Sequence, residues 1–396
     1  MREPPLLGLF IARGEVFSIK SFVRRHMGLL EPHEQFVVAS CLDTLPDDDG
    51  IPPEARTVLA RNRWLSDKGE SVSQVRRRGA RNAFWPEREL LFKGCRPVQG
   101  PADFPDESIP WGEDRIHYSR IPFGVLTAEG VMREILGHCF FHQCGLPLRS
   151  VPVCVYRYMA RGQSFGYCLV LKTSIENRIE ALIEYPDMAL SDLIVGDIVR
   201  EKTGVGEIFS GEARLHHANV RAYAETKARM LALMNQRGGF RGLLNSNIGN
   251  DVVAMRDGVA AGFFLCDFDT FRVIRIPPRP GRQFKRAFLL QCLVEVVKGS
   301  LPIIDYVYVD SRRTSASFRR RAREIYFSES SLWQAYMRRL DAVAAAVGYG
   351  SRSVRALIAE ICDTEAFMVT LLDQVVNYTT MRKSPPPAQS MYTPHD

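Results

Sequence analysis

The sequence feature that most constrains the fold is a predicted hairpin with polar residues on both sides of its open end. Two short apolar runs, at 252–255 and 263–266, flank an Arg-Asp-Gly turn. An Asp-Gly pair between two apolar runs is among the stronger short-range signals for a β-hairpin. Because the first strand of a hairpin begins where the second one ends, we expect Asn250 and Asp267 to lie close together.

Amide and carboxylate oxygens in one place favour a hard divalent cation. Asn250 and Asp267 supply one of each, and Asp269 follows as a second ligand or as an acid that orders the loop. Mg²⁺ bound together with a polyphosphate usually takes only one or two ligands from the protein. The hairpin therefore predicts a site for Mg²⁺ and a nucleotide. The structural alternative is an Asn that caps a turn and an Asp that ends a strand.

The length and composition predict an ordinary globular protein of two lobes or domains. The 396 residues are enough for two cores, and 46% of them are hydrophobic and 24% charged. Nine cysteines lie mostly within apolar stretches, as expected of reduced thiols in a cytoplasmic protein. No apolar run approaches the roughly 18–20 residues that a membrane helix needs, so we expect no membrane partner. The short apolar run at 6–12 is not predicted to be a signal peptide.

The basic residues are concentrated in short arginine runs. The net charge is +7, and the runs lie at 76–78 and 319–321. Such runs are usually solvated faces, and no aromatic residues alternate with them as they do in many nucleic-acid-binding surfaces. Nucleic-acid binding that falls steeply with salt is therefore the weakest of the functional alternatives.

The region 61–175 predicts a small lobe in which an antiparallel sheet packs with one helix. Its segments are a strand at 89–94, a helix at 128–144, and strands at 151–158 and 167–173. Thr127 is the expected N-cap of the helix, and Gly145 follows its expected end. Residues 1–60 form an N-terminal extension with short helical patterns and no assigned chemistry.

The region 176–380 predicts a larger, mainly helical lobe that also carries the hairpin. Helical apolar spacing occurs at 215–236, 284–298, 315–326, 331–347 and 353–378. The tail at 381–396 contains three consecutive prolines and is predicted to be disordered. The expected fold class is therefore α+β with two lobes.

This layout resembles the bilobal protein-kinase-like fold. Gly249-Asn250-Asp251-Val252-Val253 and Cys266-Asp267-Phe268-Asp269 are similar to the catalytic loop and the metal-binding segment of aminoglycoside and choline kinases. The small lobe resembles selenoprotein O, a kinase-fold family that transfers AMP to proteins. The similar motifs are Lys93-Gly94, Tyr118-Ser119-Arg120, Arg133-Glu134, Gly145-Leu146-Pro147 and the run at 242–247. Together they cover about residues 66–270.

The resemblance implies ATP and Mg²⁺ as cofactors and gives each candidate residue a role. Lys93 would contact the phosphates of the nucleotide and would be held by an ion pair with Glu134. Asn250 and Asp267 would hold Mg²⁺. The alternatives are a surface lysine at a strand end for Lys93 and, for Glu134, a helix-surface glutamate that faces His138 one turn later.

Two features depart from the kinase pattern. Active kinases carry an Asp about five residues before the loop Asn, which accepts the proton of the substrate hydroxyl. Here Asn245 stands at that position, and the selenoprotein O alignment places Asn247 there, although an amide cannot act as a base. Asp251 is the nearest acid, but it follows the loop Asn and is expected to point elsewhere.

The expected phosphate-binding loop is also weak. It contains Gly69 and Ser71 but only one glycine, where most kinases have two or three, so an ordinary turn is the alternative. His138 and His142 have the spacing of two zinc ligands on one helix face, but core or surface histidines are favoured.

The leading hypothesis is an ATP- and Mg²⁺-dependent transferase that moves a phosphoryl or adenylyl group to a protein or small-molecule acceptor. The alternative is a pseudokinase, an interaction or regulatory protein that keeps the fold without catalysis.

Overall fold

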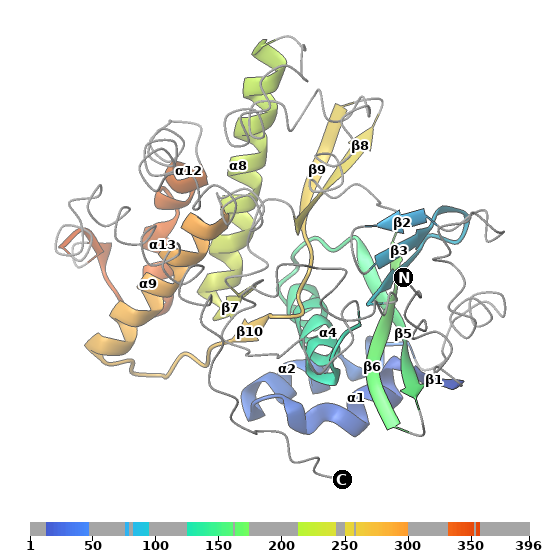
Figure 1. Cartoon of the computed structure of the whole chain (residues 1–396). Coiled ribbons are helices and arrows are strands. Elements are labelled where there is room, and N and C mark those ends of the chain that lie inside the picture. Colours follow the sequence, from blue (N-terminus) through green and yellow to red (C-terminus); the bar gives the residue numbers. More distant parts are fainter. Residues whose placement is uncertain are drawn as a thin grey trace, which may run out of the picture.

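A computed structural model describes residues 13–46, 76–78, 82–94, 125–160, 163–173, 213–242, 250–256, 259–299, 332–351 and 354–356. An antiparallel six-stranded sheet lies on one side of the molecule and a group of helices on the other (Figure 1). The hairpin and helix α4 lie between them (Figure 1). The predicted mixture of helices with an antiparallel sheet is therefore confirmed.

The sheet has the strand order β1-β5-β6-β4-β3-β2. Its strands are β1 (Arg13–Ser18), β2 (Arg76–Arg78), β3 (Asn82–Trp85), β4 (Leu90–Lys93), β5 (Ser150–Ala160) and β6 (Gln163–Thr173). The strands predicted at 89–94, 151–158 and 167–173 are confirmed as β4, β5 and β6. Strand β1 comes from the region that sequence analysis separated as an N-terminal extension, and it pairs with β5 along its whole length. The extension thus contributes an edge strand to the sheet.

The N-terminal region also contributes two helices that cover α4. Helix α1 (Ile19–His26) begins at the N-cap Ser18, and α2 (Pro32–Cys41) packs against α4. Glu34 of α2 is buried and accepts hydrogen bonds from Arg133 of α4 (3.4 Å) and from the backbone N–H of Val273 (2.9 Å). The N-terminal helices therefore hold α4 against the chain that follows the hairpin.

Helix α4 (Ala128–Gln143) begins and ends as predicted. The hydroxyl of Thr127 accepts a hydrogen bond from the backbone N–H of Gly130 (2.9 Å), and Gly145 has a φ of +63°. A left-handed residue after the last turn is favoured when it is glycine. The helix is enclosed by the sheet, by α2 and by the chain after the hairpin, so even its charged residues Arg133 and Glu134 are buried.

The helices of the other side are α8 (Ala213–Gln236), α9 (Arg282–Gly299), α12 (Leu332–Met337) and α13 (Leu340–Ala346). The prediction of a single helix at 331–347 is wrong, because a turn at 338–339 divides this region into α12 and α13. The helix predicted at 315–326, most of the one at 353–378 and the tail lie outside the described residues.

The predicted hairpin is present. Strand β8 (Asp251–Arg256) pairs with β9 (Val259–Leu265), so the second strand begins earlier than the apolar run indicated. A second, very short pair joins β7 (Gly239–Phe240) to β10 (Arg272–Val273). The β7–β10 pair brings the chain before residue 243 close to the segment that follows β9. The β8–β9 pair brings the chain after residue 249 close to the end of β9.

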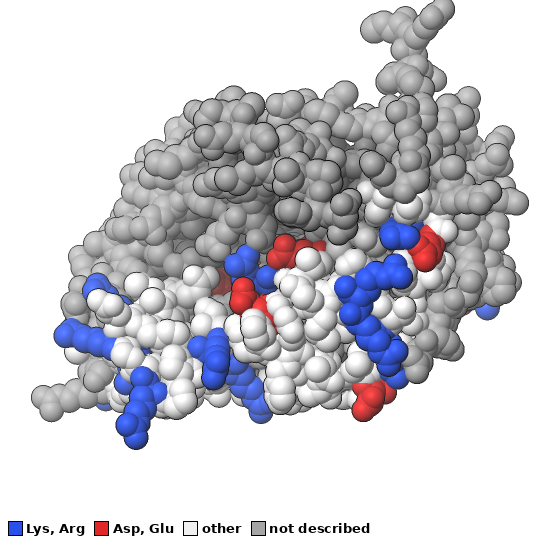
Figure 2. Space-filling view, turned by 90° about the horizontal axis from the view of Figure 1, so that it is seen from below, with Lys and Arg blue, Asp and Glu red and all other residues white. Residues whose placement is uncertain are grey.

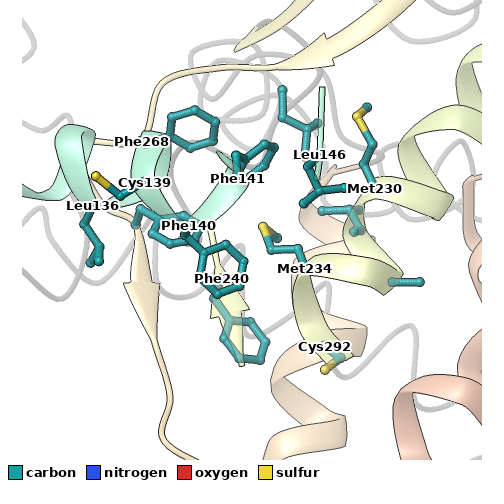
Figure 3. Packing of buried hydrophobic residues seen from close by; sticks show 14 of the residues in the cluster. Leu136, Cys139, Phe140, Phe141, Leu146, Met230, Met234, Phe240, Phe268 and Cys292 are labelled. Atoms are coloured by element: carbon teal, nitrogen blue, oxygen red, sulfur yellow. The ribbon is translucent and has the colours of Figure 1, made fainter. Parts of the chain in front are cut away.

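A hydrophobic cluster joins α4 to α8 and to the segment after the hairpin, as Figure 3 shows. The ring of Phe268 lies 4.7 Å from that of Phe141, centroid to centroid. A Cβ atom at Gly137 would lie 2.5 Å from the side chain of Phe268. Because glycine leaves this space open, the segment that contains Asp267 can approach the face of α4 that carries Glu134.

The described Lys and Arg side chains do not form one continuous basic patch on the face shown in Figure 2. On the face seen from below in Figure 2, the described Lys and Arg side chains form several separate groups with uncharged surface between them. The side chains of the arginine runs at 76–78 and 319–321 lie outside the described residues, so the expectation that nucleic-acid binding is unlikely is not tested. No helix in the described part of the chain is long and apolar enough to cross a membrane.

Candidate functional site

Four charged side chains from three parts of the chain meet at the end of β4. Lys93 Nζ lies 2.6 Å from Glu134 Oε2 and 3.7 Å from Asp269 Oδ2, and it also binds Asp267 Oδ1. Glu134 and Asp267 lie 41 and 174 residues from Lys93 in sequence. Lys93, Glu134 and Asp267 are all buried, so the alternatives of a surface lysine and a helix-surface glutamate are wrong.

Strand β4 places Lys93 in the middle of the sheet rather than at its rim. Lys93 pairs with Asn82 on β3 and with Leu169 on β6. The strand ends at Gly94, which has a φ of +77° and whose N–H donates to the side chain of Asn82 (3.3 Å). Gly94 is thus held directly after Lys93, which fixes the backbone from which the lysine side chain extends.

Glu134 connects Lys93 to the segment after the hairpin. Its Oε2 accepts hydrogen bonds from Lys93 Nζ and from the backbone N–H of Phe268 (2.6 Å). Burial raises the pKa of Glu134, and the nearby Asp267 and Asp269 act in the same direction, whereas Lys93 opposes them. A single carboxylate therefore fixes both the ammonium of Lys93 and the backbone next to Asp267.

Asp267 has a backbone conformation that turns the chain. Its φ is +66°, in the left-handed region, which Asp tolerates better than most residues do. This conformation lets the ring of Phe268 enter the core while the carboxylate of Asp267 binds Lys93. Because the chain turns at this residue from strand β9 into the core, the carboxylate of Asp267 lies among the charged groups around Lys93.

Asn250 lies at the open end of the hairpin, as predicted. Asp251 pairs with Leu265 at this end, and the thiol of Cys266 donates to the backbone carbonyl of Asn250 (2.7 Å). Asn250 and Asp267 thus flank the same end of the β8–β9 pair. Asn245, Asn247, Gly69 and Ser71 lie outside the described residues.

The oxygen atoms of Asn250, Asp267 and Asp269 are a suitable donor set for Mg²⁺ in terms of chemistry. Among the described residues, no group of three or more His, Cys, Asp or Glu side chains is placed to hold a metal ion. A metal ion bound together with a nucleotide usually takes one or two protein carboxylates, and phosphate oxygens complete its coordination. The metal role of these three residues remains a prediction.

A second charged cluster, which sequence analysis missed, surrounds the first residue of β8. Asp251 binds Lys227 Nζ (2.6 Å), Arg241 Nη1 (2.7 Å) and the hydroxyl of Tyr223 (2.5 Å). Glu295 accepts a hydrogen bond from the backbone N–H of Arg241 (2.6 Å). The two cations and two carboxylates are each at most 1% exposed. Asp251 thus points away from the Lys93 cluster, as expected.

The signals for this second cluster were present but weak. Tyr223 and Lys227 are one turn apart on the apolar face of α8, and Arg241 directly follows the buried Phe240. A charged residue at a position where the pattern calls for an apolar one indicates a buried pair. Burial lowers the pKa of Lys227 to about 8 and raises that of Tyr223.

The two histidines of α4 lie in different surroundings. His138 is buried, its Nδ1–H donates to the carbonyl of Glu134 (2.8 Å), and its Nε2 lies 2.9 Å from the hydroxyl of Ser150, whereas His142 is exposed. The core and surface histidines that were favoured over a zinc site are therefore confirmed. Burial lowers the pKa of His138 to about 4.

His138 should make the protein sensitive to mild acid. Between its unfolded pKa of about 6.5 and its folded pKa of about 4, the unfolded chain binds a proton that the native state does not. The free energy of unfolding should therefore fall as the pH falls through this window, by on the order of 3 kcal/mol from this residue alone. In His138→Gln the fall should be shallower. Urea unfolding at several pH values between 4 and 7 measures it.

His142→Gln, on the same helix, is the matched control, because this histidine is exposed. Its pH profile should match that of the wild type. A steep fall that persists unchanged in His138→Gln would assign the acid sensitivity to another group.

Comparison with known proteins does not identify the chain. No known protein family matches it, and no curated protein does. The structure alone therefore defines its class: an α+β protein in which a buried Lys–Glu–Asp cluster lies between an antiparallel sheet and a hairpin.

Proposed function

We propose that the protein is an ATP- and Mg²⁺-dependent transferase with a bilobal, protein-kinase-like fold. It would move a phosphoryl or adenylyl group to a protein or small-molecule acceptor. The observation that carries this proposal is the meeting of Lys93, Glu134 and Asp267. A strand of the sheet, the helix beside it and the end of the hairpin supply them, in the order that the kinase pattern requires.

The chemistry of the cluster suits the binding of a polyphosphate. An ammonium with a fixed position stabilises the negative charge of phosphate oxygens, and its effect is larger where water is excluded. Glu134 holds Lys93 in place from one side, and Asp267 from the other. These contacts fix the position of the ammonium, and a transferase of this class depends on such positioning.

The site would hold Mg²⁺ through Asp267 and Asn250, with Asp269 as a further ligand. Mg²⁺ held by these residues would supply positive charge that neutralises the phosphates of a nucleotide. Asn250 and Asp267 flank one end of the β8–β9 pair, and Asp267 also binds Lys93, the residue proposed to contact the phosphates.

One observation favours a binding protein without catalysis. Asp251 is the acid nearest to the loop Asn, and it is 1% exposed and bound to two cations. It is not placed to accept a proton from a substrate, and Asn245 and Asn247 are amides. Label transfer distinguishes the possibilities: label from α-labelled ATP indicates adenylyl transfer, and label from γ-labelled ATP indicates phosphoryl transfer. Mg-ATP binding without either supports a pseudokinase.

Asp267→Asn should abolish stabilisation by Mg-ATP. A ligand present at 100 times its dissociation constant stabilises the native state by about 2.7 kcal/mol. Asn tolerates the left-handed backbone of this position but lacks the charge of the carboxylate. We therefore expect a clear rise in the melting temperature of the wild type with millimolar Mg-ATP, and little or none for the variant.

Asp341→Asn is the control for this experiment, because it removes an exposed carboxylate of α13. It should keep the full shift. The proposal fails if the wild type gives no shift, or if Asp267→Asn shifts as far as the wild type does.

A further inference from the structure

Arg241 is a buried cation that the proposed chemistry does not explain. It follows β7 directly and is 0% exposed. Its guanidinium binds Asp251 Oδ1 (2.7 Å) and two backbone carbonyls, those of Cys266 (2.7 Å) and Asn250 (3.4 Å). One side chain thus connects the first residues of β8 to the end of β9.

Stability alone does not account for an arginine here. Removing a guanidinium from water is costly, and replacing a buried ion pair by apolar residues of similar volume is often neutral or stabilising. What arginine provides is a planar group with five N–H donors, which can bind a carboxylate and carbonyls at the same time. The property specific to Arg241 is therefore the geometry that it imposes on its partners.

The two carbonyls belong to the residues that place the proposed metal ligands. One is the backbone carbonyl of Asn250, which also accepts a bond from the thiol of Cys266. The other lies in the peptide plane that joins Cys266 to Asp267, so fixing it fixes the direction in which the chain enters Asp267. Arg241 thereby sets the backbone at both sides of the open end.

The backbone of Arg241 is itself held firmly. Its N–H donates to Glu295 of α9 (2.6 Å), and its carbonyl accepts a bond from the hydroxyl of Thr270 (2.6 Å). These bonds do not involve the guanidinium, so they persist when the side chain is changed. The guanidinium therefore acts from a fixed base.

The geometry points to Arg241 as a positioning residue that sets the spacing of Asn250 and Asp267 for a divalent cation held with a nucleotide. This inference rests on the proposed function of the site. Arg241 acts through the two carbonyls, and Lys93 keeps its own contacts with Glu134 and Asp267. Loss of the guanidinium should therefore affect metal-dependent binding more than binding of the nucleotide by itself.

The test compares ATP affinity with and without the metal. Titration calorimetry measures the dissociation constant of ATP once with EDTA and once with excess Mg²⁺. The constant in EDTA divided by the constant in Mg²⁺ is the ratio that reports the contribution of the metal. In Arg241→Lys, which keeps the charge but not the fork of donors, we expect this ratio to fall by about tenfold while the constant in EDTA changes by less than about twofold. A defect that is only structural would raise both dissociation constants by the same factor.

Two further variants sharpen the test. Lys227→Met removes the other cation bound to Asp251, whose ammonium binds Asp251, Tyr223 and the carbonyl of Gly299. It should lower stability but leave the ratio unchanged. Thr270→Val removes only the side-chain bond to the carbonyl of Arg241, and it should lower the ratio by a smaller factor. It decides the question if Arg241→Lys does not fold.

The possible results separate the inference from the proposed function. A wild-type ratio in both Arg241→Lys and Thr270→Val overturns the inference alone, and so does an equal loss in Lys227→Met. A ratio of about one in the wild type, with ATP still bound, overturns the metal site on which the inference depends. If the wild type binds no ATP under either condition, the proposed function fails and the inference fails with it.

Discussion

Asp251→Asn is expected to lower the free energy of unfolding by roughly 3–5 kcal/mol. Asparagine has the shape of the carboxylate but not its charge, so Lys227 and Arg241 would remain buried without the anion that binds both of them. Removing one partner of a buried ion pair is far more costly than removing the whole pair, because the remaining charge has no water to solvate it. Urea unfolding followed by circular dichroism measures the loss.

Glu225→Gln provides the control, on the helix that carries Lys227. Glu225 of α8 binds Arg338 and Arg339 (2.7 Å for Arg339), but its side chain is 31% exposed. Exposed ion pairs contribute at most about 1 kcal/mol, so this variant should unfold close to the wild type. If Asp251→Asn were no less stable than Glu225→Gln, the charges of the second cluster would have to be solvated in a way that their burial does not indicate.

The elements that could be predicted from the sequence are those defined by local signals. Helix α4 was placed to within one residue because Thr127 caps its first turn and Gly145 can adopt the left-handed conformation that ends it. The β8–β9 hairpin was found for the same reason, since an Asp-Gly turn between apolar runs determines which residues pair. In both cases the information lies within a few neighbouring residues.

Features that depend on distant partners were predicted poorly. Strand β1 has few apolar residues, and it is a strand because β5 supplies its hydrogen-bond partners. The arrangement of Lys227, Arg241 and Asp251 was missed because apolar periodicity assigns charged residues to the surface. The local pattern gives only the weak signal of charged residues at apolar positions, and it does not show that they pair across 24 and 10 residues of sequence.

The candidate site was predicted partly from local signals and partly from a resemblance to known kinases. The sequence placed Asn250 and Asp267 at one end of a hairpin, because that follows from strand pairing. The contact of Lys93 with Glu134 was expected only from a resemblance to known kinases, and its direct contact with Asp267 was not predicted, since separations of 41 and 174 residues leave no local trace.

The two charged clusters meet at the peptide bond between Cys266 and Asp267. The carbonyl of Cys266 in this bond binds Arg241, whose cluster contains two cations and two carboxylates. After this bond, the carboxylate of Asp267 binds Lys93, in a cluster of one ammonium and three carboxylates. The first cluster is balanced in charge and suits a structural role. The second is rich in oxygen donors and suits the binding of a cation, so structure and proposed chemistry are joined at the end of β9.

Lys93→Met is expected both to destabilise the protein and to abolish nucleotide binding. It leaves the buried carboxylates of Glu134 and Asp267 without the ammonium that binds them, at a cost of roughly 3–5 kcal/mol. Lys172→Met is the matched control, because Lys172 is an exposed lysine on the neighbouring strand β6. It should retain the stability and the Mg-ATP affinity of the wild type.

A double-mutant cycle then tests whether the effect of Lys93 acts through Glu134. If Glu134 is the partner that makes the loss of Lys93 costly, neutralising it in Glu134→Gln should make Lys93→Met less damaging, with a coupling of about 1–3 kcal/mol in the free energy of unfolding. Nucleotide affinity should not recover in the double variant, because the ammonium that would contact the phosphates is still absent. Additive losses in stability would contradict the buried ion pair. Recovery of Mg-ATP binding without Lys93 would contradict its proposed contact with the nucleotide.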